Sequence, residues 1–311
     1  MKIIMYHYVR RPETTPFPAI KALHTDAFRA QIDWLRSHCD LISGHDLMRA
    51  VTENTPLPER AALLTFDDGY RDCLTDVAPI LHAHNISACF FPVADCVENH
   101  SVLDVNKIQF ILAAGNLNDI LLEVRDAANA AFDAGEGPDW PELLDRFAVA
   151  NRWDPPEVQL VKKLLQRELP DPWRTLTIQS LFTRHVTHDE TDFAHELYCN
   201  AAEWGDLLDR GHFLGGHGVM HRWLDHLSPA DQRREVEGTR AFLKRLGVHG
   251  PWCMCYPHGG HNQSLHHILQ ENDCRVGLTV TVRDANLRKD PPLELPRWNT
   301  NDFPPKGNAG I

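Results

Sequence analysis

Residues 61–70 read AALLTFDDGY, an apolar run that ends abruptly in two acids and a glycine. A short apolar run bounded by a turn signal predicts a strand that is buried on both faces. Asp67 and Asp68 would then lie at the carboxyl end of that strand, the edge where α/β folds build their sites. Adjacent carboxylates repel each other, so either a cation stabilises one of them or one carries a proton. The alternative is an ordinary Asp-Asp-Gly turn that caps the next helix.

Short apolar stretches alternate with longer amphipathic stretches on both sides of this segment, which predicts an α/β fold. One predicted helix begins with Thr25 as its cap and buries Phe28, Ile32 and Leu35 on one face. Another ends where Gly211 follows residues 202–209. Strands are predicted at residues 2–9, 61–66, 88–94, 212–214, 252–256 and 276–280, and further helices at residues 70–84 and 229–246.

The segment from about residue 100 to residue 200 has helical patterns without a convincing strand. Helices are predicted at residues 105–114, 117–132, 140–149 and 156–169. We interpret this segment as a large α-helical insertion within a single domain of residues 1–303. Residues 304–311 are expected to form a loose tail.

The composition of the 311 residues, with 43% hydrophobic and 24% charged residues, is that of a globular protein. A formal net charge of −12 disfavours nucleic acid and anionic membranes as partners. No apolar run approaches the ~18 residues needed to span a bilayer. The start, MKIIMYHYVRRPE, is too short and polar for a signal peptide, so the eight cysteines predict reduced thiols and a cytoplasmic protein. Cys253 and Cys255 are expected to be buried structural thiols.

Residues 215–221 read GGHGVMH and form the second motif. Histidines four residues apart lie on one face of a helical turn, so His217 and His221 can bind one metal ion together. The chain has 19 histidines, so a chance surface pair is the alternative. The zinc-protease form of this spacing requires Glu after the first histidine, and Gly218 excludes it.

Three weaker segments are YPHGGHN at 256–262, Leu295-Pro296-Arg297 and Met5-Tyr6-His7. Taken singly, they fit a loop, a surface arginine and a structural histidine. Taken together, all five segments are predicted where strands end, and they supply two acids, several histidines and an arginine. One carboxylate with two histidines leaves metal positions open for water and substrate, and the second acid can then act as a base.

These motifs resemble those of the NodB-type polysaccharide deacetylases, carbohydrate esterase family 4. TFDDG at 65–69 is similar to the first motif of that family, and His-x-x-x-His at 217–221 is similar to the second. The surrounding stretch LLDRGHFLGGHGVMHRWLDHLS at 207–228 strengthens the resemblance, which covers roughly residues 1–99 and 201–303. It implies an irregular (β/α) barrel, often seven-stranded, with the site at the carboxyl ends of the strands.

The resemblance also implies roles for single residues. Asp67 corresponds to the catalytic base, and Asp68, His217 and His221 to the ligands of a divalent metal, Zn²⁺ or else Co²⁺ or Ni²⁺. Residues 256–259 resemble the third motif, in which the backbone N–H of His258 would polarise the substrate carbonyl.

Two positions depart from the family pattern. Cys255 occupies the place where the family commonly has an arginine that orients the base, and the usual late Leu-x-x-His is missing. The branch resembling poly-N-acetylglucosamine deacetylases takes its acid histidine from a Tyr-His context, which Tyr6-His7 matches. Leu-Pro-Arg is common in that branch, so Arg297 is expected to replace the missing arginine.

The expected activity is metal-dependent hydrolysis of an N-acetyl or N-formyl group on an amino sugar. The sugar would be nucleotide-linked, lipid-linked or part of an oligosaccharide, in the biosynthesis of surface polysaccharide or lipopolysaccharide. A sugar-binding domain with weak catalysis is one alternative. An iron oxygenase with two histidines and one carboxylate is another, although those sites usually sit on all-β scaffolds.

Overall fold

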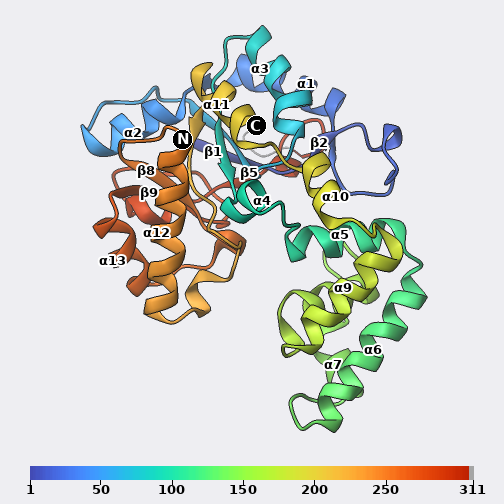
Figure 1. Cartoon of the computed structure of the whole chain (residues 1–311). Coiled ribbons are helices and arrows are strands. Elements are labelled where there is room, and N and C mark those ends of the chain that lie inside the picture. The colour runs from blue at the N-terminus through green and yellow to red at the C-terminus, as the bar shows by residue number, and fades with distance from the viewer. Residues whose placement is uncertain (308–311) are drawn as a thin grey trace. The chain divides into compact units, whose positions relative to one another are not determined.

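The computed structural model describes residues 1–307 and divides into two compact units. The first unit contains Met1–Arg11, Ala22–Ser101 and the chain from Ala194 onward (Figure 1). The second contains Val102–Phe193 together with Pro12–Lys21. Most of the expected tail, residues 308–311, lies outside the described residues.

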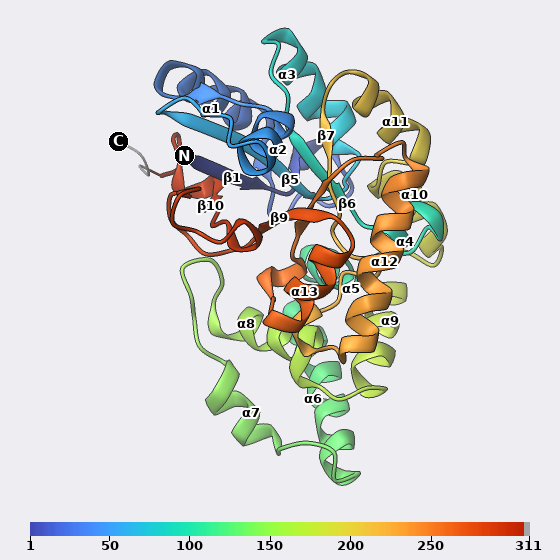
Figure 2. The ribbon, with the colours of Figure 1, turned by 90° about the vertical axis from the view of Figure 1, so that its left-hand side faces the viewer.

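A parallel sheet of six strands lies at the centre of the first unit (Figure 2). Its order is β10-β1-β5-β6-β7, and β4 pairs with β5 as well. All eight residues of β5 are buried, as the apolar run predicts. The strands are β1 (Lys2–Tyr6), β4 (Asp40–Leu41), β5 (Ala61–Asp68), β6 (Cys89–Pro92), β7 (Phe213–Leu214) and β10 (Trp298–Asn299).

Two further strands, β8 (Trp252–Cys255) and β9 (Cys274–Leu278), pair in parallel with each other. Isolated parallel bridges join Gly216 to Met254 and Leu278 to Leu295. Hydrogen bonds therefore connect this pair to the segment after β7 and to the segment before β10. The α/β class is confirmed, but the described strands do not form one closed sheet, so the seven-stranded barrel stays a prediction.

Helices cover both parts of the sheet structure. Residues of α1, α3 and α11 pack on one face of the central sheet, and residues of α12 and α13 pack beside β8 and β9 (Figure 1). A small parallel pair, β2 (Val9–Arg10) and β3 (Leu23–His24), precedes α1. The helices are α1 (Thr25–His38), α2 (Gly44–Thr52), α3 (Ala78–Ala83), α4 (Ala94–Glu98), α11 (Ala201–Asp209), α12 (Pro229–Arg245) and α13 (Gln263–Glu271).

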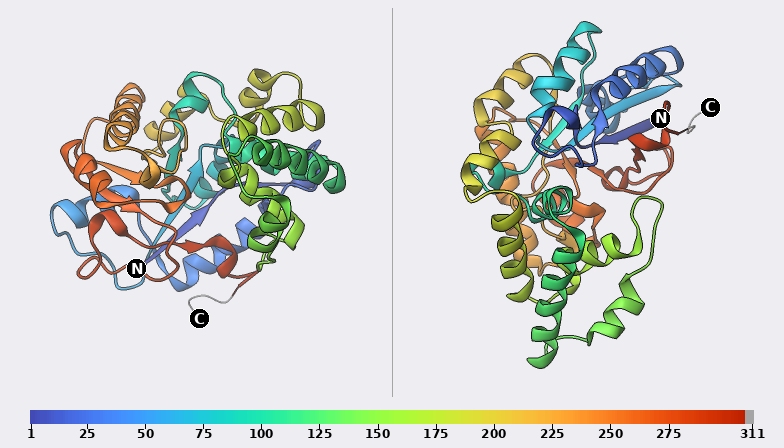
Figure 3. Two further views of the ribbon diagram at one scale, coloured as in Figure 1. Left: turned by 90° about the horizontal axis from the view of Figure 1, so that it is seen from below. Right: turned by 90° about the vertical axis from the view of Figure 1, so that its right-hand side faces the viewer.

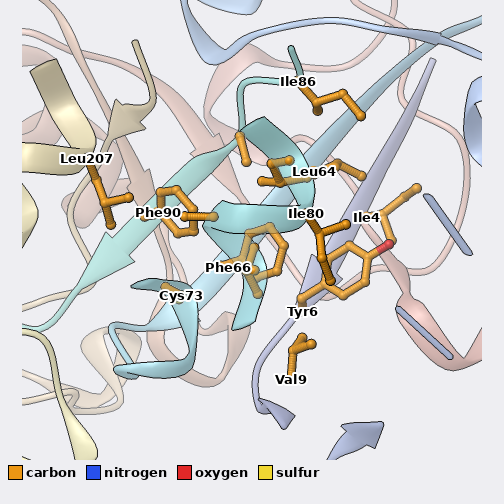
Figure 4. Close-up of a cluster of buried hydrophobic side chains, with 14 of the residues drawn as sticks. Ile4, Tyr6, Val9, Leu64, Phe66, Cys73, Ile80, Ile86, Phe90 and Leu207 are labelled. Carbon is orange, nitrogen blue, oxygen red and sulfur yellow. The ribbon is translucent and has the colours of Figure 1, made fainter. Parts of the chain in front are cut away.

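The alternation of side chains along β5 divides the core in two. Leu64 and Phe66 pack with Tyr6, Ile80 and Phe90 in one cluster, which Figure 4 shows. Leu63 belongs to a second cluster with residues of β8 and β9. Full burial of one such side chain stabilises the fold by about 1.5–3 kcal/mol. By the same alternation, Asp67 lies on the face of β5 that Leu63 occupies.

The ends of two predicted helices differ from expectation. α1 buries Phe28, Ile32 and Leu35 as predicted, but its N-cap is His24, whose side chain accepts from the Asp26 N–H. Thr25 instead donates its hydroxyl to Asp76 at 2.9 Å. The predicted helix at 70–84 is a π-helical turn, Cys73–Val77, followed by α3, which has Pro79 near its start. Proline lacks an N–H, so a continuous α-helix through this point would lose a hydrogen bond.

Residues 102–193, all of which the structure describes, contain helices and no strand (Figure 3). Pro12–Lys21 belongs to this unit because Phe17 contacts the rings of Phe110 and Phe193, at 5.0 and 5.9 Å, and Lys21 forms an ion pair with Asp154. The helices are α5 (Asp104–Ala114), α6 (Leu117–Asp133), α7 (Trp140–Phe147), α8 (Pro156–Lys163), which continues into a π-helical turn at Leu164–Glu168, α9 (Trp173–His185) and α10 (Glu190–Leu197).

Within residues 1–307, no helix combines the length and the apolarity needed to cross a bilayer. All eight cysteines are buried and unpaired, including Cys253 and Cys255.

Candidate functional site

Asp67 and Asp68 end β5, as the sequence predicts. Asp68 adopts a φ of +70°, and Gly69 follows with a φ of +82°. The left-handed region is costly for residues other than glycine, and such strain concentrates at functional sites. A side chain at position 69 would also approach the backbone of Pro92, because an added Cβ would lie 3.0 Å from its Cα. The strand therefore ends in a turn that presents both carboxylates to neighbouring charged groups.

Asp68, His217 and His221 converge with their ligand atoms within 4.8 Å of one another. Oδ1 of Asp68 lies 3.2 Å from Nε2 of His217 and 3.4 Å from Nε2 of His221. The other carboxylate oxygen, Oδ2, accepts a short hydrogen bond from the hydroxyl of Tyr70. Tyr70 thus occupies one oxygen of Asp68 and leaves the other directed at the two imidazoles.

The protonation of His217 indicates that a cation fits this group. Nδ1 of His217 lies 2.8 Å from the carbonyl oxygen of Cys255, which can only accept, so Nδ1 carries a proton. In the neutral ring, Nε2 then carries a lone pair, which faces a carboxylate oxygen of Asp68. Two acceptors face each other stably only when a proton or a metal ion lies between them. Two imidazoles and one carboxylate are ligands typical of Zn²⁺ and related ions.

The segment that carries the two histidines is a loop and not the expected helical turn. Gly218 and His221 both have positive φ, +80° and +53°, which no α-helix tolerates. The buried carboxylate of Glu235 on α12 accepts from the N–H groups of Val219 and Met220, at 2.7 and 3.3 Å. Backbone turns held by Glu235, and not a helical turn, therefore bring the two imidazole rings together, with their centroids 4.7 Å apart.

Asp67 forms a buried ion pair with Arg297. Nη1 and Nη2 of Arg297 each donate to one carboxylate oxygen at 2.8 Å, a bidentate arrangement. The guanidinium also donates to the Thr279 carbonyl at 2.9 Å and to the Thr65 hydroxyl at 3.2 Å. Burial opposes the charge on Asp67, but Arg297 together with His217 and His7 holds the pKa of this carboxyl below its ordinary value. Unlike the other site segments, Arg297 precedes a strand, β10, and does not follow one.

His7 follows β1 and lies beside Asp67. Its Nε2 is 4.0 Å from Oδ2 of Asp67, and 41% of its side chain is exposed. The structure therefore places His7 on the solvent side of the buried Asp67–Arg297 pair.

His258 lies in the turn after β8, with a φ of +57°. Its ring stacks on Trp223 at 4.3 Å and meets the ring of His221 at 4.5 Å. Burial is the main cause that lowers the pKa of His258 to about 4. A neutral imidazole therefore lies beside the proposed ligand His221.

Sequence reasoning missed Tyr70 and Glu235. Tyr70 directly follows the Asp-Asp-Gly motif, and a hydroxyl next to a predicted metal ligand is a usable signal. Glu235 lies on the buried face of an amphipathic helix, where an unpaired acid would be costly. Cys255 is a third contributor, since its carbonyl orients His217. Its thiol also lies near Asp67 and His217, but Arg297 already binds both oxygens of Asp67.

Comparisons with known proteins identify the family. A family model described as polysaccharide deacetylase matches residues 54–146 and 183–277, more than half of the chain. A 78-residue stretch is 40% identical to poly-beta-1,6-N-acetyl-D-glucosamine N-deacetylase of Escherichia coli K12. That stretch is 25% of this chain and only 12% of the relative.

Solved structures share the fold. The deacetylase PplD of Streptococcus pyogenes superposes with a TM-score of 0.59 at 16% identity, covering 96% of this chain and 91% of that one. IcaB from Ammonifex degensii gives 0.55 at 15% identity, with 96% and 90% covered. The BpsB deacetylase domain of Bordetella bronchiseptica gives 0.56 at 16%, with 96% and 95% covered. These structures show a shared fold, and the family model, which matches more than half of the residues, shows that the chain belongs to the polysaccharide deacetylase family.

Proposed function

We propose that this protein removes the acetyl group from an N-acetylated amino sugar by hydrolysis, with a divalent cation bound to Asp68, His217 and His221. One observation carries the proposal. Asp67 and Asp68 are adjacent, yet Asp67 is bound by Arg297 while Asp68 faces two imidazoles. The two carboxylates therefore have separate partners, which suits one for proton transfer and the other for binding a cation.

Zn²⁺ is the cation that the two imidazoles and one carboxylate suit best, and Co²⁺ and Ni²⁺ fit the same ligands. When bound, such a cation supplies Lewis-acid chemistry and makes water a stronger nucleophile near neutral pH. Tyr70 orients Asp68, and the Cys255 carbonyl orients His217, so both ligands are held before the cation arrives.

The residues of the chain divide the proton transfers between them. Asp67, kept ionised by Arg297, accepts a proton from the water that attacks the acetyl carbon. His7, at the exposed side of Asp67, donates a proton to the nitrogen of the leaving amine. The backbone N–H of His258 donates to the carbonyl oxygen, where negative charge develops. The products are acetate and a free amino sugar.

The substrate that we propose is a saccharide containing N-acetylglucosamine. The 78-residue likeness to poly-beta-1,6-N-acetyl-D-glucosamine N-deacetylase supports this class, although it spans about an eighth of that relative. An oligosaccharide, a nucleotide-linked sugar and a lipid-linked sugar are the forms to test, and an N-formyl group is the variant of the acyl group. A role in surface polysaccharide or lipopolysaccharide biosynthesis, a cytoplasmic location and a closed barrel belong to the same proposal.

A sugar-binding domain without catalysis is disfavoured by the Asp67–Arg297 pair. A binding domain has no use for an oriented, ionised carboxylate beside a cation site. The burial of that pair carries a desolvation cost that a purely structural role would have to offset.

The deciding experiment is a screen for released amine. The metal-loaded protein is incubated with N-acetylated β-1,6-linked oligosaccharides, nucleotide sugars and lipid-linked sugars, with and without a chelator. Amine release from at least one substrate, lost with chelator and restored by Zn²⁺ or Co²⁺, is the expected result. Release that is insensitive to chelator, or no release from any substrate, contradicts the proposal.

A further inference from the structure

A second group of ligand-type side chains lies outside the site described above. His261, His266 and Glu294 offer one ligand atom each, within 4.8 Å of one another. His261 lies in the loop before α13, His266 lies in α13, and Glu294 ends a short 3₁₀ helix at Pro292–Glu294. The tertiary fold brings these elements together, since Glu294 is far from the two histidines in the sequence.

The spacing in this group suits an ion better than a hydrogen bond. Nδ1 of His266 lies 3.7 Å from Oε1 of Glu294, beyond the range of an N–H···O hydrogen bond. Two ligands of a tetrahedral zinc ion, each about 2.0–2.1 Å from it, lie roughly 3.4 Å apart. The Asp68 group shows comparable separations, 3.2 and 3.4 Å.

The two ring nitrogens of His266 have different surroundings. Nδ1 faces Glu294, whereas Nε2 is buried and has no hydrogen-bond partner among residues 1–307. One ion can bind only one nitrogen of a ring, so Nδ1 is the nitrogen that this group offers. The rings of His261 and His266 stack at 5.1 Å with an interplanar angle of 14°.

We propose that His261, His266 and Glu294 bind a second divalent transition-metal cation, Zn²⁺, Co²⁺ or Ni²⁺, with solvent completing its coordination. Two imidazoles and one carboxylate match the preference of these borderline ions and exclude Mg²⁺ and Ca²⁺, which take oxygen ligands.

The position of this second site defines its role. His261 stacks on Tyr256 at 5.2 Å, and the hydroxyl of Tyr256 donates to the Leu293 carbonyl at 2.9 Å. The cation would therefore reinforce an existing link between the turn that carries His258 and the segment that leads to Arg297. Because it binds only the folded chain, it raises the stability of that link by mass action.

The test is a titration of the chelator-treated protein with Co²⁺. Binding is followed by the visible absorption of the bound Co²⁺, and the metal that stays bound after dialysis is measured. Wild type is expected to bind two equivalents, and His266→Gln, His261→Gln and Asp68→Asn one each. The matched control is His267→Gln, because His267 is next in the same helix, is 72% exposed and pairs with Glu271 at 3.1 Å. This control is expected to keep two equivalents.

One equivalent in the wild type overturns the proposal, as do two equivalents in both His266→Gln and His261→Gln. A thermal readout separates the two sites. Zn²⁺ should still raise the melting temperature of Asp68→Asn, and this rise should vanish in Asp68→Asn combined with His261→Gln. If His266→Gln fails to fold, His261→Gln decides, since His261 is only partly buried.

Discussion

Histidine groups at the two ends of β7 are built for different purposes. Before the strand, Nε2 of His212 lies 2.9 Å from Nε2 of His82, and Nδ1 of His212 accepts from the Ala88 N–H at 3.2 Å. Beyond the strand, His217 faces the carboxylate of Asp68 at 3.2 Å, and its Nδ1 donates to a carbonyl. The two buried histidines are therefore opposite tautomers. His212 presents an N–H group at Nε2 to its partner, and His217 presents a lone pair at Nε2.

The difference indicates which features would suit a buried histidine to bind a metal ion. His212 must carry its proton on Nε2, because Nδ1 accepts, so it donates to His82 and the pair is satisfied without an ion. Among residues 1–307, no third His, Cys or acid places a ligand atom with this pair. His217 has its lone pair on Nε2 and an anion opposite. An acidic partner and the tautomer of His217, more than burial, distinguish the proposed metal site.

The largest expected effect concerns the acid. Asp68→Asn removes the anionic ligand, so zinc affinity should fall by more than about 100-fold and hydrolysis to background. His212→Gln should bind zinc as the wild type does, because its pair has no role in the site. Zinc titration of both variants checks this contrast, and an Asp68→Asn protein with wild-type zinc affinity would refute it.

The second effect concerns Arg297. Arg297→Met leaves the buried carboxylate of Asp67 without its partner, which should lower the free energy of unfolding by about 3–5 kcal/mol. Adding Asp67→Asn should recover much of that loss, because the unpaired charge is removed, but should not restore hydrolysis. Urea unfolding of the three proteins measures this, and a loss below about 1 kcal/mol in Arg297→Met would contradict the account.

A smaller effect is expected at Tyr70. Tyr70→Phe removes the hydroxyl that orients Asp68, and the loss of such an outer hydrogen bond typically weakens metal affinity by about 10- to 100-fold. The control is Tyr198→Phe, which keeps the aromatic stack on Tyr70. Equal zinc affinity in Tyr70→Phe and the control would show that the hydroxyl does not position the ligand.

The smallest effect is the pH dependence at the amino end of β7. Burial, with His82 nearby, lowers the pKa of His212 to about 4. As the pH falls, His212 in the unfolded chain takes up its proton before His212 in the folded chain does. The contribution of this group to the free energy of unfolding is therefore fully present above pH ~6.5 and declines towards pH ~4. From pH 7 to pH 5 this group should account for at most about 2 kcal/mol. Urea unfolding at pH 7, 6 and 5 should show a shallower decline for His212→Gln, and parallel declines would contradict the assignment.

The sequence predicts the strands that carry the site because their apolar runs are short and end in turn residues. β5, β8 and the start of β1 lie close to their predicted positions. Small elements were missed, such as β10 and α2, because two-residue strands and short helices have too few residues to show a periodicity. Thr25 was the wrong cap because the choice between two adjacent polar residues depends on the tertiary partner Asp76.

Much of the candidate site could be located from motifs alone, since Asp67, Asp68, His217 and His221 stand in two short stretches. The contacts of Arg297 could only be inferred by resemblance, since no local pattern links it to a carboxylate 230 residues away. The loop conformation of the histidine pair was also beyond local reasoning. It depends on left-handed residues and on Glu235 from a distant helix.

The most direct test of the central claim is turnover by Asp67→Asn at matched zinc content. Asp67 is proposed to move a proton and Asp68 to hold the cation, so this variant should bind one zinc equivalent in the Asp68 group. It should release amine from an N-acetylated oligosaccharide at least about 100-fold more slowly than the wild type. An Asp67→Asn protein that is active, or that has lost its zinc from this group, would contradict the account.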